Sequence, residues 1–312
     1  MDIYLALSSI RRSLQAQGVT LPEVPDFLTQ HGFQGLELSD RDLGSHNPHH
    51  AEPLRHRCQA LGCGLVYDVN CDLTLADPLR WQAQVGYVKQ MLPFAHGLGA
   101  RALRICLGGQ LLSIQGLLRR FSASIDHSPA QQGARSDHRA ASLKGLLLNR
   151  CTLQLARTAR RHLPARPPHL GEKTQRAIAA LREIIPIAAQ LRLPVVIENH
   201  WGISTRPEPI LQVVDALNTP WLGTCPDFGN FPRSVDRYHG LCLLAPKALH
   251  AQAKSWRFDR NGEERSIDYQ RALGILRKAR YDGPIAIEYE GPENDLEACL
   301  RTRALILKHW HA

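Results

Sequence analysis

The sequence lacks the features that would place it in a membrane, on a secretory route or in a disulfide framework. No run approaches the roughly 18 apolar residues of a membrane span. Near the N-terminus Arg11 and Arg12 follow the apolar stretch instead of preceding it, which is not the order of a secretory signal. The eight cysteines are scattered without a C-x-x-C pair, a pattern that favours reduced thiols. We therefore expect a cytoplasmic protein with no membrane partner.

Positive charge is concentrated in one segment of the chain. The formal net charge is +9, and residues 111–170 carry ten Lys and Arg against two Asp. Most of the excess therefore comes from this stretch, which is also rich in Ser, Gln and Ala. This composition is typical of a mobile insertion between structural elements, and that is our interpretation. A nucleic-acid partner is disfavoured, because charge alone carries no specificity.

Outside this segment, two kinds of pattern alternate along the chain. Short β-rich runs occupy residues 3–9, 35–40, 64–70, 102–109, 194–200, 222–230, 248–256 and 284–291. Helical patterns lie between most of them, many ending at Gly or Asn as C-caps do, at 21–32, 50–62, 78–99, 174–192, 208–218, 267–283 and 295–310. One further helix, within 231–240, is poorly defined. We predict a single α/β domain over residues 1–312, a (β/α)8 TIM barrel with the basic insertion after its fourth strand.

Acidic residues stand at the ends of three β-rich runs in the C-terminal half. They are Glu198, Asp227 and Glu288. An isolated buried carboxylate is costly unless it is neutralised or meets a cation. The active site of such a barrel lies at the C-terminal ends of its strands, so these carboxylates should meet there. The pattern predicts one shared metal ion.

The last two runs carry polar residues at alternate positions. Because side chains alternate along a strand, His250, Gln252 and Lys254 share one face, which we expect to point towards the barrel mouth. By the same rule Glu288 and Glu290 share a face. The seventh strand is therefore expected to add a residue to the site.

Four motifs together carry a family resemblance. They are E-N-H-x-G at 198–202, P-D-F-G-N at 226–230, A-K-S at 253–255 and I-E-Y-E-G at 287–291. The chain resembles the xylose isomerase-like TIM barrels, and within them the sugar phosphate isomerase/epimerase group. The resemblance covers most of residues 1–110 and 171–312 and is strongest from about 195 to 291.

The resemblance implies one divalent metal ion held by Glu198, Asp227, a residue of the seventh strand and Glu288. The family usually has His where this chain has Gln252, so Gln252 is the candidate by register and His250 is its rival. An oxygen-rich ligand set favours Mn²⁺ or Mg²⁺, with Zn²⁺ or Co²⁺ as alternatives.

The function implied is a sugar or sugar phosphate isomerase or epimerase, with a small carbohydrate as substrate. Glu198 and Glu288 are the candidate acid–base pair for proton transfer next to a carbonyl. The candidate substrate-binding residues are His200, Lys254, Glu37, Arg104 and Trp201. Each has a structural alternative: a loop hydrogen bond, an ion pair with a ligand carboxylate, a buried acid satisfied by a neighbouring strand, a structural arginine and apolar packing, respectively. Relatives often form dimers or tetramers, so a homo-oligomer is also open.

Two other classes compete with this interpretation. An endonuclease IV-like nuclease needs many His ligands, including one shortly after the sixth-strand Asp, but Phe228-Gly229-Asn230 follow Asp227. A non-catalytic ligand-binding barrel is the second alternative: the presence of all three carboxylates argues against it, and Gln252 argues mildly for it. Other chemistry on the same scaffold stays open, since fold does not fix function.

Overall fold

The computed structural model describes residues 1–43, 46–109 and 171–311. The insertion predicted at 111–170 lies outside the described residues. No helix in the described ranges has the length and apolar character to cross a bilayer.

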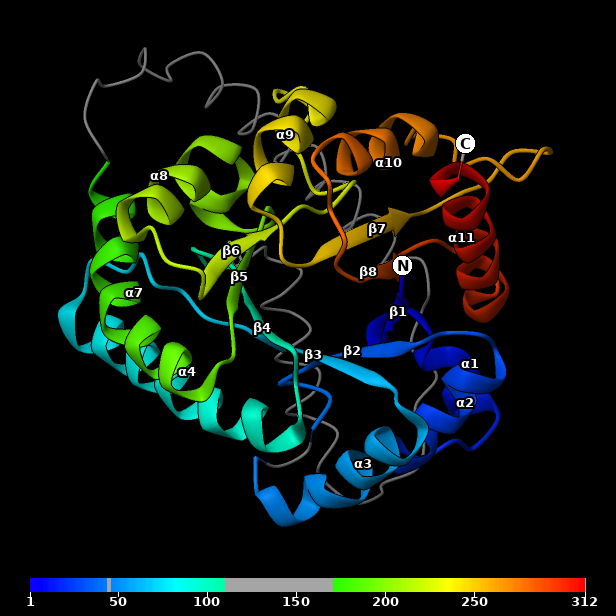
Figure 1. The fold of residues 1–312 in the computed structure, drawn as a ribbon, viewed down its shortest axis with the longest axis horizontal. Coiled ribbons are helices and arrows are strands. Elements are labelled where there is room, and N and C mark those ends of the chain that lie inside the picture. The colour runs from blue at the N-terminus through cyan, green and yellow to red at the C-terminus, as the bar shows by residue number, and fades with distance from the viewer. Residues whose placement is uncertain (44–45, 110–170, 312) are drawn as a thin grey trace, which may run out of the picture. The chain divides into compact units, whose positions relative to one another are not determined.

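Eight parallel strands form the centre of the domain (Figure 1). Their sheet order is β6-β5-β4-β3-β2-β1-β8-β7, and bridges from Thr224 to Ala248 and from Asp227 to Gln252 connect β6 with β7. The ring is therefore nearly closed, and the predicted (β/α)8 barrel is confirmed. The strands are β1 Ile3–Ala6, β2 Gly35–Ser39, β3 Gly64–Val69, β4 Ala102–Ile105, β5 Val195–Glu198, β6 Leu222–Cys225, β7 Ala251–Ser255 and β8 Ile285–Tyr289.

Helices surround this ring of strands in Figure 1. Several begin at a residue whose side chain accepts from the first free N–H groups of the helix, as Asp77 does for Arg80 and Asp268 for Arg271. The helices are α1 Arg11–Ala16, α2 Val24–Gln30, α3 Pro48–Leu61, α4 Pro78–Leu98, α7 Glu172–Leu191, α8 Pro207–Leu217, α9 Arg237–Leu244, α10 Tyr269–Lys278 and α11 Asp295–Trp310.

The poorly defined sixth helix is α9, and it begins late in the expected stretch. Asp236 is its cap, accepting from the backbone N–H of Tyr238 and His239. The loop that connects β6 to this helix runs from Pro226 to Val235. A long loop after a strand is where a barrel places its site residues, which explains why the helical pattern is short here.

The barrel interior consists of an apolar layer below a polar one. Tyr4 belongs to a buried cluster with Val66, Ala102, Val196, Cys225 and Ala286. Its ring fills the space left by Gly35 and Gly64, because a Cβ on Gly64 would lie 1.8 Å from the Tyr4 hydroxyl. Two residues further along β1, Ala6 pairs with Glu37. Side chains alternate along a strand, so the residues two positions after Val66, Ala102, Val196, Cys225 and Ala286 also face inward. These residues are charged, and they form the site.

Candidate active site and metal centre

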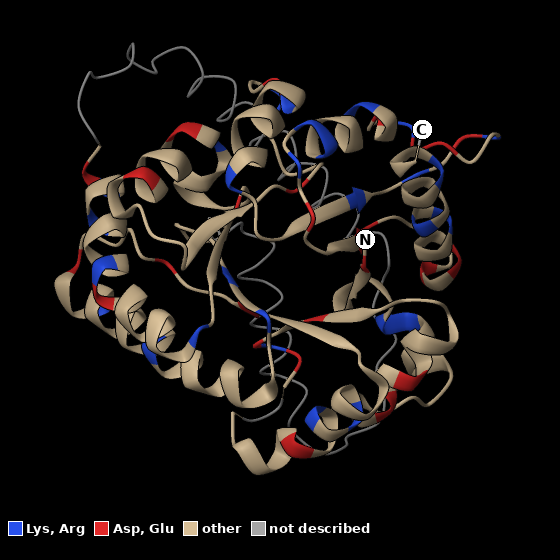
Figure 2. Cartoon of the chain, viewed as in Figure 1, with Lys and Arg blue, Asp and Glu red and all other residues tan. Residues whose placement is uncertain are grey.

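The eight strands contain six charged residues, and all six take part in the same buried network of ion pairs or lie against it. Figure 2 shows that most of the charge of both signs lies on the outer helices and loops. An ionised side chain inside a barrel is costly unless it is paired, so charge concentrated here indicates a function. The six are Glu37, Asp68, Arg104, Glu198, Lys254 and Glu288.

Three carboxylates meet at the C-terminal end of the barrel. Glu198 ends β5, Asp227 follows β6 and Glu288 lies in β8, and one oxygen from each lies within 4.8 Å of the other two. Glu198 and Asp227 are fully buried. The sequence predicted that these three would converge, and the structure brings them together. Like charges this close repel strongly in a buried site, so the cluster calls for a cation.

The Asp227 carboxylate is held on one oxygen and open on the other. Its Oδ1 accepts from the backbone N–H of Gly229 and of Asn230, both at 2.7 Å. Its Oδ2 is buried and has no hydrogen-bond partner within the described ranges. Burial raises the pKa of Asp227 to about 6, against the attraction of the nearby Lys254. The D-F-G-N turn therefore fixes a carboxylate with one oxygen available to a ligand.

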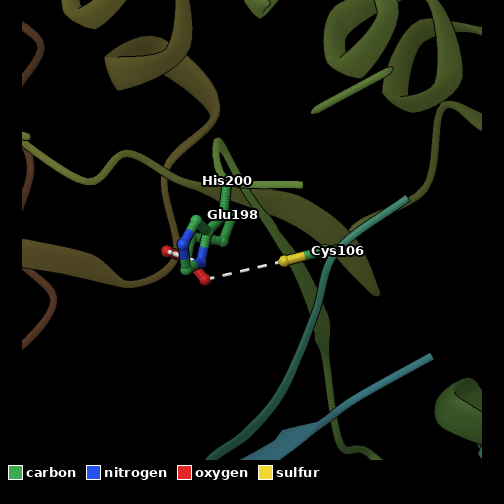
Figure 3. Close-up of side chains that lie close together, drawn as sticks. All are labelled: Cys106, Glu198 and His200. Carbon is green, nitrogen blue, oxygen red and sulfur yellow. Dashed lines mark hydrogen bonds and ion pairs between the residues drawn. The ribbon is translucent and has the colours of Figure 1, made fainter. Parts of the chain in front are cut away.

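Glu198 is surrounded by four side chains. Arg104 forms an ion pair with Oε2, and Asn230 Nδ2 donates to Oε1 at 2.7 Å. His200 Nδ1 lies 3.2 Å from Oε1 and Cys106 Sγ lies 3.7 Å from Oε2 (Figure 3). Cys106, Glu198 and His200 also satisfy the spacing of a metal cluster. However, the adjacent Arg104 guanidinium disfavours a second cation on this side of Glu198.

Lys254 is fully buried against the carboxylate cluster. Its Nζ donates to Glu288 and, at 2.9 Å, to Glu290. Burial alone would lower the pKa of Lys254, but Glu288, Asp227 and Glu290 raise it above its usual value. Burial would likewise raise the pKa of Glu288, yet Lys254 and Arg104 lower it to about 2. Lys254 thus forms the ion pair that was the alternative to a substrate contact.

Arg104 uses all three of its nitrogens on carboxylates. Nη1 pairs with Glu198, Nη2 lies 3.0 Å from Asp68 Oδ2, and Nε lies 2.8 Å from Glu37 Oε1. The Nε contact is an ion pair whose angle does not satisfy a hydrogen bond. Burial raises the pKa of Asp68 to about 7 even though Arg104 lies beside it. The predicted role of Arg104 towards a substrate anion stays a prediction; the contacts seen are structural.

Glu37 accepts from two residues of the β7 region. His250 Nε2 lies 2.8 Å from Oε2, and Gln252 Nε2 donates to Oε1 at 2.7 Å. Glu37 is thus a buried acid satisfied from other strands. His250 does not belong to the carboxylate cluster, and its Nδ1, like Gln252 Oε1, is buried without a partner in the described part of the chain. The strand register places Gln252 directly beside Asp227.

His200 and Trp201 stack on each other where the chain leaves β5. Their ring centroids are 3.8 Å apart with an interplanar angle of 21°, and both are partly exposed. The following Gly202 has φ +59, and a Cβ there would lie 2.7 Å from the Gly108 Cα. The loops after β4 and β5 therefore approach each other at these two glycines, with no room for a side chain, directly after the two stacked rings.

Four residues of the site were not predicted: Asp68, Cys106, Asn199 and Asn230. Asp68 pairs in register with Arg104, and Cys106 lies two residues after Arg104 and contacts Glu198, so alternation could have identified both. Asn199 and Asn230 belong to the E-N-H and P-D-F-G-N motifs, but nothing in those motifs states that they bond Asp227 and Glu198.

The residues present fit a divalent cation. Three buried carboxylates (Glu37, Glu198 and Asp227) and two partly buried ones (Asp68 and Glu288) face two permanent cations among the described residues, Arg104 and Lys254. When all five are ionised, three negative charges are uncompensated. In the described part of the chain, Asp227 Oδ2 and Gln252 Oε1 are buried oxygens without a hydrogen-bond partner, and they belong to two residues joined by a parallel bridge. Hard divalent ions take such oxygen ligands.

The family profile described as Xylose isomerase-like TIM barrel matches residues 138–307. That is more than half of the chain. The chain belongs to the xylose isomerase-like TIM barrel family. The resemblance seen in the four sequence motifs is confirmed.

Individual relatives are more distant. A 3-oxo-isoapionate decarboxylase of Pectobacterium atrosepticum is 26% identical over 135 residues, 43% of this chain and 46% of that protein. The match thus spans less than half the length of this relative.

Several solved structures share the fold over nearly their whole length. D-psicose 3-epimerase from Clostridium cellulolyticum H10 has a TM-score of 0.64 at 11% identity, covering 100% of this chain and 98% of that one. D-allulose 3-epimerase from Methylomonas sp. has a TM-score of 0.66 at 12% identity, covering 99% and 98%. The IolI protein, solved with a bound zinc atom, has a TM-score of 0.65 at 12% identity, covering 99% and 98%. At such identities these likenesses concern the fold alone.

Proposed function

We propose that this protein is a divalent-metal-dependent isomerase or epimerase of a sugar or sugar phosphate. The observation that carries the proposal is the buried cluster of Glu198, Asp227 and Glu288, in which Asp227 Oδ2 has no partner among the described residues. Several solved structures with this fold are sugar 3-epimerases, which supports an enzyme that modifies sugars.

Four residues would hold the ion: Glu198, Asp227, Glu288 and Gln252. A divalent cation at this place would polarise a substrate carbonyl and stabilise the negative charge that develops when the adjacent carbon loses a proton. The oxygen-rich set favours Mn²⁺ or Mg²⁺ over Zn²⁺ or Co²⁺. The stacked rings of His200 and Trp201 would form part of the substrate pocket, because they are partly exposed and lie next to Glu198.

Glu198 and Glu288 are the proposed acid–base pair. They come from different strands, so one could take a proton from the substrate carbon at a carboxylate oxygen while the other returns a proton. Glu288 is ionised at neutral pH, and the ammonium of Lys254 makes it a weak base. Lys254 has a second partner in Glu290. A shift of its ammonium towards Glu290 would raise the basicity of Glu288 during turnover.

Deuterium exchange tests this proposal. Metal-loaded wild type, Glu198→Gln and Glu288→Gln would be incubated with a panel of keto-sugars in D₂O and followed by NMR. Substrate-dependent deuterium uptake at the carbon next to the carbonyl is expected for the wild type. The exchange rate of each variant should be roughly 10²–10⁴-fold lower than that of the wild type, which is the typical contribution of a general acid or base. Equal rates in the wild type and both variants would refute the assignment.

A decarboxylase is the second candidate, and the sequence match to 3-oxo-isoapionate decarboxylase favours it. Loss of CO₂ from a 3-oxo acid leaves the same negative charge next to a carbonyl, so the same site could stabilise it. Release of CO₂ from a 3-oxo sugar acid, without isotope exchange into the keto-sugars, would select this candidate over the first.

A further inference from the structure

Gln252 and Glu37 interact across the interior of the barrel. Gln252 lies in β7 and Glu37 in β2, which are not neighbours in the sheet, and the Gln252 Nε2 donates to Glu37 Oε1 at 2.7 Å. Gln252 is fully buried and Glu37 nearly so. The other end of the amide, Gln252 Oε1, is buried without a hydrogen-bond partner among residues 1–43, 46–109 and 171–311.

The charge on Glu37 decides which end of the amide faces it. Arg104 Nε lies 2.8 Å from Glu37 Oε1 and His250 Nε2 lies 2.8 Å from Glu37 Oε2, so the permanently charged guanidinium favours the ionised carboxylate. An ionised carboxylate only accepts hydrogen bonds. A flipped amide would place the Gln252 oxygen against the carboxylate and lose the hydrogen bond. Glu37 therefore fixes the amide with its nitrogen inward and its oxygen free.

The free oxygen belongs to a residue that is paired with Asp227. The backbone N–H of Gln252 donates to Pro226 O at 3.0 Å, and the backbone N–H of Phe228 donates to Gln252 O at 3.0 Å. Asp227 lies between these two bonds and carries the other orphaned oxygen, Oδ2. Two adjacent residues on neighbouring segments thus each present a buried oxygen that no described group satisfies. An amide oxygen is a hard, neutral donor of the kind that Mg²⁺ and Mn²⁺ accept.

We propose that Glu37 is a positioning residue that fixes the orientation of the Gln252 amide. In this orientation Gln252 Oε1 serves as a neutral ligand to the divalent ion, next to the carboxylate ligand Asp227. This inference rests on the proposed function, since it needs the same ion. It assigns Glu37 an indirect role in place of a contact with substrate. Mutation of a group that orients a metal ligand typically lowers the metal affinity about 10–100-fold.

A double-mutant cycle on Mn²⁺ affinity tests the proposal without reference to activity. Metal-stripped wild type, Glu37→Gln, Gln252→Ala and the double variant would be titrated by calorimetry, and thermal unfolding of each metal-free protein would confirm that it is folded. In the background that keeps Gln252, we expect Glu37→Gln to lower the Mn²⁺ affinity about 10–100-fold. In the Gln252→Ala background the same change should have little further effect, because the amide that Glu37 orients is gone.

Asp68→Asn is the matched control. It removes one carboxylate charge from the same Arg104 network without touching Gln252, so its effect should be equal in both backgrounds. Glu37→Met, which removes the acceptor altogether, serves as a second variant if Glu37→Gln does not fold. An unchanged affinity in Glu37→Gln, or an equal loss in both backgrounds, would overturn the proposal.

The cycle also separates this inference from the proposed function. Wild type that binds no divalent ion contradicts both. Wild type that binds Mn²⁺, with a loss in Gln252→Ala and none in Glu37→Gln, contradicts only the role of Glu37.

Discussion

Asn199 and Asp227 exchange two hydrogen bonds across the ends of β5 and β6. The Asp227 backbone N–H donates to Asn199 Oδ1 at 2.7 Å, and Asn199 Nδ2 donates to Asp227 O at 3.0 Å. Both residues are fully buried. One side chain thus satisfies the N–H and the C=O of the residue that carries the open carboxylate oxygen.

Asn199→Ala should therefore reduce both stability and metal affinity. It leaves a buried N–H and a buried C=O unpaired, at a cost of about 1–3 kcal/mol for such a group. Thermal unfolding of the metal-free protein and Mn²⁺ titration measure the two effects. Asn261→Ala, at an exposed loop position, is the control and should change neither. Unaltered stability in Asn199→Ala would show that the loop does not depend on this exchange.

Gln252→His should change the metal preference. The imidazole could donate one nitrogen to Glu37, as the amide does, and offer the other to the ion, an arrangement common in metal sites. Imidazole suits Zn²⁺ and Co²⁺ better than Mg²⁺, so the affinity ratio of Co²⁺ to Mg²⁺ should rise at least about 10-fold. Competition titrations measure the ratio, with Gln59→His on the exposed face of α3 as control. A ratio that does not move would argue against Gln252 as a ligand.

Lys254→Met should destabilise the metal-free protein strongly. The change leaves Glu288, whose side chain is 12% exposed, without its Lys254 cation, and removing one partner of a buried ion pair costs about 3–5 kcal/mol. Lys247→Met is the matched control, because Lys247 is partly exposed in its pair with Asp215 and such pairs contribute about 0–1 kcal/mol. Denaturant unfolding without metal gives both values. A similar decrease in the free energy of unfolding in Lys254→Met and Lys247→Met would mean that the Lys254 ammonium does not compensate the charge of the carboxylate cluster.

Asp68 should make the metal-free protein less stable as the pH rises. Its pKa is about 7 in the folded protein against an ordinary value of 3.8, so the folded state binds the proton more tightly. The stability that this proton provides is present below about pH 4 and is lost as the pH rises towards 7. A shift of this size corresponds to a few kcal/mol.

Unfolding measured across this pH range, with Asp68→Asn alongside, tests the assignment. The variant cannot ionise at this position, so its stability should fall less between pH 4 and 7. Parallel curves for wild type and variant would show that Asp68 does not titrate in this window.

The fold could be predicted because its determinants are local. The β-rich runs are bounded by helices that stop at residues such as Gly62 and Gly99, both of which have positive φ at a C-cap. The convergence of Glu198, Asp227 and Glu288 followed from the same argument, since parallel strands of a barrel place their C-terminal ends together.

The partners of the site residues could not be predicted in the same way. Arg104 meets Glu198 across 94 residues of chain, and Gln252 meets Glu37 across 215. Such contacts depend on which strands face each other through the barrel interior. The sequence offered Arg104 and Glu37 as substrate contacts or as structural residues, and only the three-dimensional register shows the ion pairs that favour the second alternative.

A calorimetric Mn²⁺ titration of metal-stripped wild type and of Asp227→Asn would show whether the carboxylate cluster is a metal centre. We expect about one Mn²⁺ per chain in the wild type and an affinity at least about 10-fold lower in the variant, because Asp227 supplies the open oxygen of the cluster. Absence of Mn²⁺ and Mg²⁺ binding in the wild type, or equal affinity in the variant, would contradict the claim that these carboxylates form a metal centre.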